Sequence, residues 1–102
     1  MEQRAFARNP SFLNTKLFHD DYSYDALILN LSQNGIYFMS DAYLSSGLNI
    51  KISIPLETTE LKVTFKVVRM STIDSIFRRF GAELLTPSQE YTNFVRGRIG
   101  SI

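Results

Sequence analysis

Two segments in the middle of the chain alternate strictly between apolar and polar residues. In residues 48–54 leucine and isoleucine alternate with asparagine, lysine and serine, and Pro55 follows directly. In residues 61–67 leucine, valine and phenylalanine alternate with lysine and threonine. A period of two puts successive side chains on opposite faces of a strand, so each segment predicts a strand with one face against a core. Pro55 should end the first strand, because proline has no amide proton to donate to a neighbour.

Four further extended segments are predicted, separated by residues that favour turns. They span residues 11–18, 26–31, 36–39 and 76–84. The polar residues 19–22 should turn the chain between the first two of these segments. Because the connections are too short for parallel crossovers, we expect neighbouring strands to pair in antiparallel fashion.

Two of the segments depart from simple alternation. The segment 26–31 is apolar at both parities, which is typical of a central strand covered on both sides. After residues 61–67 the alternation fails at Arg69, which has the apolar parity and so predicts a bulge or the end of the strand. In residues 26–31 we expect Ala26 and Ile28 on one face of the strand, and Leu27, Leu29 and Leu31 on the other.

A helix should close the chain. Thr86 can cap it, Pro87 suits the first helical position, and Gln89 can complete a capping box. We expect the helix to end between residues 97 and 100. Its apolar residues recur at helical spacing and should pack against the sheet: Tyr91, Phe94, Val95 and Ile99.

These elements predict a mainly β domain, a six-stranded antiparallel barrel followed by one α-helix. Closure of the barrel is favoured because it removes exposed strand edges. The 102 residues fit one domain, with an arm at 1–10, the barrel at 11–85 and the helix at 86–99.

Composition narrows the functional classes. The chain has no cysteine and one histidine, so neither a disulfide framework nor a metal site is expected, and no cofactor is implied. The usual catalytic constellations are not visible, which argues against an enzyme. A net charge of +1 argues against coating DNA or RNA. The chain shows no signal-peptide pattern and no apolar run of the roughly 20 residues that a membrane span needs, so we expect a cytoplasmic protein.

Two arginines lie four residues apart near the N-terminus, at Arg4 and Arg8. Asn9 and Pro10 follow and favour an extended lead into the first strand. Guanidinium groups bind phosphates in bidentate fashion, address guanine O6 and N7 together, and stack on bases. Alone, however, such a pair is most often only exposed charge near a chain terminus.

A second polar motif, residues 30–35, follows the doubly apolar segment. Asn30 lies beside a buried face and needs a hydrogen-bond partner, and Ser32 can cap a turn or bind a ligand. Gly35 is expected to supply a positive φ after Asn34. By itself the motif is explained by an Asn-Gly hairpin turn, and its first three residues also match an N-glycosylation acceptor.

Taken together, the two motifs resemble the signature of the PilZ family. That signature is Arg-x-x-x-Arg followed by Asp or Asn-x-Ser-x-x-Gly, and the later residues 81–84 resemble the family's Gly-x-x-apolar step. The resemblance covers nearly the whole chain. It implies a six-stranded antiparallel barrel with a C-terminal helix and a site for the bacterial second messenger cyclic di-GMP.

The resemblance also implies roles for individual residues. Arg4 and Arg8 would grip the phosphates and guanine edges of cyclic di-GMP. Asn30 and Ser32 would hydrogen-bond the ligand from the barrel surface, and Gly35 would keep the turn open. Two further candidates are Gln3, which stands where many relatives have a basic residue, and Gly81, where a ligand could approach closely.

The function that follows is a receptor whose arm orders over cyclic di-GMP and changes the surface shown to a protein partner. The alternative is a protein-interaction adaptor on the same barrel that has lost nucleotide binding. Binding of single-stranded nucleic acid through aromatics and arginines is a third reading, which the near-zero net charge disfavours.

Overall fold

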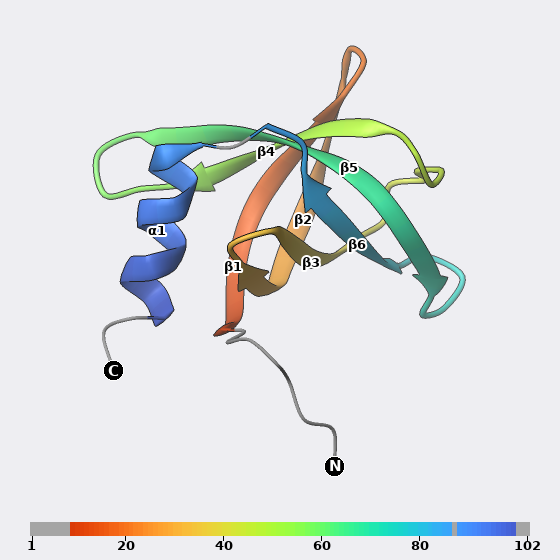
Figure 1. Ribbon diagram of the computed structural model, residues 1–102. Coiled ribbons are helices and arrows are strands. Elements are labelled where there is room, and N and C mark those ends of the chain that lie inside the picture. The colour runs from red at the N-terminus through yellow and green to blue at the C-terminus, as the bar shows by residue number, and fades with distance from the viewer. Residues whose placement is uncertain (1–8, 87, 100–102) are drawn as a thin grey trace.

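The computed structural model describes residues 9–86 and 88–99. In chain order this part of the protein forms β1 (Asn9–His19), β2 (Tyr22–Ser32), β3 (Gly35–Ser40), β4 (Asn49–Pro55), β5 (Glu60–Thr72), β6 (Arg78–Leu84) and α1 (Gln89–Ile99), as Figure 1 shows.

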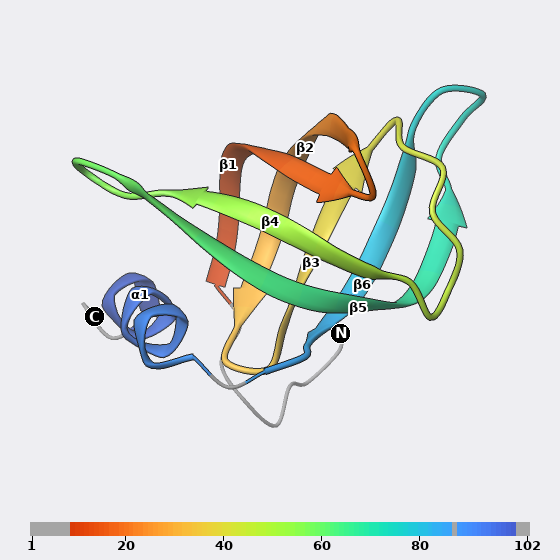
Figure 2. The same ribbon diagram turned by 90° about the horizontal axis from the view of Figure 1, so that it is seen from above.

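The strands close into an antiparallel barrel in the order β1-β2-β3-β6-β5-β4. Two meanders, β1-β2-β3 and β4-β5-β6, are therefore joined by pairing of β3 with β6 and of β1 with β4. The second seam is short, because only residues 16–18 of β1 are in register with residues 51–53 of β4. The predicted barrel and helix are confirmed, and the helix lies outside the ring of strands (Figure 2).

The inward face of the barrel is apolar, as the period of two predicts. Ile50, Ile52 and Ile54 of β4 are buried, and β4 ends at Pro55. Aromatic rings fill the centre: Phe38 of β3 stacks on Phe80 of β6 with a centroid distance of 5.1 Å.

The prediction for the faces of β2 was wrong at one residue. Ile28 pairs with Phe38 and Asn30 with Tyr37, so Leu29 is an extra residue on β2. Such a bulge reverses the side-chain parity beyond it. Leu31 is consequently buried with Ala26 and Ile28, whereas Leu27 and Leu29 are half-buried.

The irregularity predicted at Arg69 is a bulge and not a strand end. Val67 pairs with Ala82 and Arg69 with Gly81, so Val68 is the extra residue, and β5 continues to Thr72. Figure 1 shows β5 as a long ribbon that bends across the barrel. The bulge explains how an arginine on the apolar parity reaches the outer surface, where it is exposed.

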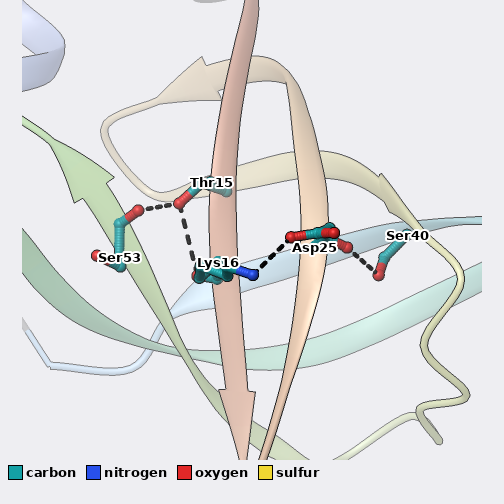
Figure 3. A network of polar contacts seen from close by, with 5 residues as sticks. All are labelled: Thr15, Lys16, Asp25, Ser40 and Ser53. Atoms are coloured by element: carbon teal, nitrogen blue, oxygen red, sulfur yellow. Dashed lines mark hydrogen bonds and ion pairs between the residues drawn. The ribbon is translucent and has the colours of Figure 1, made fainter.

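A polar network ties four strands together at the end of β3 remote from Gly35 (Figure 3). The Thr15 hydroxyl of β1 donates to the Ser53 carbonyl of β4. The Lys16 ammonium lies 2.8 Å from the Asp25 carboxylate, and the Ser40 hydroxyl donates to the Asp25 carbonyl at 2.7 Å. The exposed ion pair adds little stability, but the Ser40 bond satisfies a buried hydroxyl.

Ser88, and not Thr86, caps the helix. The Ser88 hydroxyl accepts a hydrogen bond from the Tyr91 amide at 3.2 Å. Gln89 donates from its side chain to Asn93 at 3.0 Å instead of reaching back to complete a capping box. The helix starts at Gln89, two residues later than a Thr86 cap followed by a Pro87 start would require. Pro87 itself lies outside the described residues.

One face of α1 packs on the core, as predicted. Tyr91 and Val95 are fully buried, and Phe94 is partly buried against the core. The side chain of Ile99, also expected on this face, is not among those that the structure describes. The helix ends at Ile99, within the expected interval. Among the described residues no helix is long and apolar enough to cross a membrane.

Replacing the cap tests the assignment of the helix start. We expect Ser88→Ala to lower the free energy of unfolding by about 1 kcal/mol, because one amide of the first turn loses its acceptor. Thr86→Ala is the matched control and should change the free energy of unfolding by less than about 0.5 kcal/mol. Urea denaturation measures both, and a larger effect of Thr86→Ala would contradict the Ser88 cap.

Candidate functional site

Four strands place two rows of residues side by side on the outer surface of the barrel. Residues paired directly across an antiparallel sheet share one face. Successive pairs across β2, β3, β6 and β5 give a first row of Asn30, Tyr37, Gly81 and Arg69. The neighbouring pairs give a second row of Ser32, Gly35, Glu83 and Lys66.

A hollow of about 260 Å³ is lined by five of these eight residues. Asn30 and Ser32 line it from β2, Gly35 from β3, and Arg69 and Glu83 from β5 and β6. Gly35 has no side chain, so its backbone forms part of the lining. Three of the predicted site residues, Asn30, Ser32 and Gly35, therefore lie together at one hollow.

Gly35 is needed for a reason other than the expected one. Gly47, with φ of 96°, is the glycine with positive φ among the described residues, so the expectation for Gly35 was wrong. Gly35 is the first residue of β3, after a two-residue loop of Gln33 and Asn34. A Cβ built on Gly35 would lie 2.3 Å from the Ala82 carbonyl oxygen, so the close approach of β6 excludes a side chain.

Gly81 accommodates a neighbouring side chain. A Cβ at Gly81 would lie 3.5 Å from Arg69 Cγ and 3.6 Å from Arg69 Nε, so the stem of Arg69 covers this glycine. Arg69 lines the hollow, although its place in the sequence indicated only a bulge or a strand end. An arginine at an apolar position of the alternation was the sequence signal for an unusual role. Its position at the hollow, however, depends on the register of β5 with β6.

The helix holds the hairpin that carries the motif. The Tyr91 hydroxyl lies 2.8 Å from the Ser32 carbonyl oxygen and 3.0 Å from the Gly35 carbonyl oxygen, and donates to them. The Ser32 hydroxyl donates to the same Gly35 carbonyl at 3.3 Å. Burial raises the pKa of Tyr91, so the hydroxyl stays protonated and able to donate.

Three predicted site residues, Gln3, Arg4 and Arg8, lie outside the described residues. The chain nevertheless connects them to the hollow, because β1 begins at Asn9 and Asn9 pairs with Leu31, a lining residue. Within residues 9–86 and 88–99 no group of three or more His, Asp or Glu side chains could hold a metal ion.

A comparison with protein-family models matches the PilZ domain over residues 2–97, which includes both motifs. The chain belongs to the PilZ domain family. The match covers the arginine pair, the Asn30–Ser32–Gly35 motif and the whole barrel. A comparison with curated protein sequences finds no match.

Three solved structures share the PilZ fold of this chain. An inhibitor of motility from Bacillus subtilis (MotI/DgrA) has a TM-score of 0.74 at 18% identity, covering 99% of this chain and 51% of its own. The PilZ domain of YcgR from Escherichia coli, solved with c-di-GMP, has a TM-score of 0.73 at 16% identity, covering 98% and 91%. The PlzA protein of Borreliella burgdorferi, in complex with c-di-GMP, has a TM-score of 0.70 at 18% identity, covering 95% and 41%. The chain thus spans about half of the first protein and about two fifths of the third.

The close contact at Gly35 can be tested with alanine. We expect Gly35→Ala to lower the free energy of unfolding of the PilZ barrel by about 1–3 kcal/mol, because the new methyl group would overlap the Ala82 carbonyl. Gly97→Ala is the matched control: it lies in α1 with open space around it and should be neutral or raise stability by up to about 1 kcal/mol. Thermal and urea unfolding of both variants gives the comparison, and equal effects would refute the backbone contact.

The Tyr91 hydroxyl can be tested through pH. The folded pKa is raised above the ordinary 10.0, so its stabilising contribution is present below pH 10.0 and is lost as pH rises above it, where the unfolded chain ionises first. Tyr91→Phe should cost about 1–2 kcal/mol at neutral pH. The difference in unfolding free energy between wild type and variant should shrink above pH 10.0. An unchanged difference would contradict the buried, donating hydroxyl.

Proposed function

We propose that this PilZ domain is a receptor for cyclic di-GMP, and not an enzyme, with the hollow as the barrel side of its binding site. The observation that carries the proposal is the meeting of Asn30, Ser32 and Gly35 at one hollow on the outer barrel surface. The solved structures of the YcgR PilZ domain and of PlzA, which share this fold, contain c-di-GMP. We place the receptor in the bacterial cytoplasm.

The chemistry of the hollow suits a guanine nucleotide. The Asn30 amide can both donate to and accept from a base edge, and the Ser32 hydroxyl can do the same. Both belong to β2, which is paired on its two sides with β1 and β3. The barrel therefore fixes these groups before the ligand arrives, which reduces the entropy lost on binding.

The hollow alone is too small for a whole cyclic dinucleotide. Its volume of about 260 Å³ lies below the roughly 300–1,000 Å³ of typical ligand pockets. Further contacts must come from outside it, and the chain offers Arg4 and Arg8. Arg8 is one residue, about 3.8 Å between Cα atoms, from Asn9, which pairs with Leu31 of the hollow. Arg4 is at most roughly 14 Å further along the chain, so both can reach the same ligand.

The arm gives the receptor its signalling step. Ligand phosphates would hold Arg4 and Arg8 by charge-assisted hydrogen bonds, with Gln3 beside them, and order the arm over the barrel. A ligand shifts the arm toward the ordered state only if it binds that state more tightly than the other. Contacts that the arm makes only when ordered would supply this difference in affinity. The ordered arm would then present a new surface to a protein partner.

A protein-interaction adaptor on the same barrel is the second candidate, and the hairpin between β5 and β6 favours it. Met70, Ile73, Ile76 and Phe77 are exposed there, with Ile76 at 57%. The Asp74 carboxylate accepts hydrogen bonds from the amides of Ile76 and Phe77 at 2.8 Å, which fixes the hairpin and lowers the pKa of Asp74. Adjacent exposed apolar side chains of this kind mark interaction surfaces.

Calorimetric titration with cyclic di-GMP tests the receptor. We expect binding by the wild type, and a loss of at least about tenfold in affinity for Arg8→Ala and Asn30→Ala, because each removes a ligand hydrogen bond. Lys51→Ala removes one positive charge from β4, outside the hollow, and is the control that should bind normally. Ligand at about 100 times Kd should raise the unfolding free energy by roughly 2.7 kcal/mol.

The outcomes separate the candidates. An absence of both binding and thermal shift would favour the adaptor. Tight binding that survives both Arg8→Ala and Asn30→Ala would refute the proposed site. Digestion with trypsin, which cleaves after arginine, reports on the arm, and the ligand should slow cleavage at Arg4 and Arg8. Unchanged cleavage in the bound protein would contradict ordering of the arm.

A further inference from the structure

Arg69 has an unusual environment for a surface arginine. Its Cγ, Cδ and Nε atoms all lie within 4 Å of the point where a side chain on Gly81 would begin. The stem of the side chain therefore follows the barrel surface over Gly81. The bulge at Val68 fixes the backbone that holds it there.

This arrangement directs the arginine to the hollow. Arg69 and Asn30 stand at opposite ends of one row, with Tyr37 and Gly81 between them, and both line the hollow. Within the described residues the Arg69 side chain makes no hydrogen bond or ion pair. Its guanidinium donors are therefore available at a hollow that Asn30 and Ser32 also line.

The charges that line the hollow also favour a ligand-binding role for Arg69. Glu83 lines the hollow as well, and a carboxylate disfavours an anionic ligand. Glu83 of β6 pairs directly with Lys66 of β5. The cation next to Glu83 is therefore Lys66 and not Arg69. Arg69 is thus the cation among the described residues that line the hollow.

We propose that Arg69 is a third ligand-binding arginine of the site, supplied by the barrel wall, and that it binds the nucleotide from the side opposite to Asn30 and Ser32. This inference rests on the proposed cyclic di-GMP site. A guanidinium offers a planar fork of donors that fits either a phosphate or the O6 and N7 atoms of guanine, and the ligand carries both. Arg69 lies on a paired strand, so its backbone position is set before the ligand arrives.

Titration calorimetry with cyclic di-GMP on wild type, Arg69→Gln, Arg69→Lys and Lys51→Gln tests the proposal. We expect Arg69→Gln to weaken binding about ten- to hundredfold, the range for one charge-assisted contact. Lys51→Gln removes the same charge from another strand and should change Kd by less than about twofold. Arg69 is exposed, so these variants should fold, and thermal unfolding without ligand checks that they do.

Two further measurements identify the ligand group. If Arg69 holds a phosphate, Arg69→Lys should recover most of the affinity, and the affinity of Arg69→Gln should depend less on salt than that of the wild type. If it holds a guanine edge, lysine should not restore affinity and the salt dependence should change little. Wild-type affinity in Arg69→Gln would overturn the inference and leave the receptor standing. An absence of wild-type binding would overturn the receptor and this inference together.

Discussion

Pairing of β3 with β6 is the interaction on which the rest of the structure depends. It runs from Gly35 opposite Glu83 to Ser40 opposite Arg78, and it joins two meanders that are each formed by local hairpins. Asn30 and Ser32 come from one meander and Arg69 from the other, so the hollow exists only because this seam forms. Since the Gly35 backbone touches the Ala82 carbonyl, a residue with a side chain would hold the two halves of the site apart.

Much of the fold could be predicted from the sequence, because a period of two directly reports which side chains face a core. Residues 48–54 and 61–67 show this, and the misplaced Arg69 revealed its bulge. The bulge at Leu29 left no such trace, because every residue from 26 to 31 but Asn30 is apolar and a change of parity is then invisible. Ser88 and Thr86 are chemically alike as caps, and only the path of the chain into α1 decides between them.

The site was predicted less completely, and the reason is distance along the chain. Asn30, Ser32 and Gly35 belong to one short motif, so a local pattern was sufficient to select them. The need for glycine at position 35, however, arises from a strand almost fifty residues later, and the local expectation of a positive φ was wrong. Arg69 reaches the hollow only through the register of β5 with β6, and Arg4 and Arg8 stay predictions.

The short seam between β1 and β4 affects how a ligand would act on the barrel. Only residues 16–18 of β1 are in register with β4, so the first half of β1 is held mainly by its pairing with β2. We expect this half-strand to open locally at a lower free energy than the rest of the barrel. A ligand that contacts both the arm and β2 would bridge the strands that separate in such an opening. Part of its binding free energy would then appear as slower amide hydrogen exchange along β1.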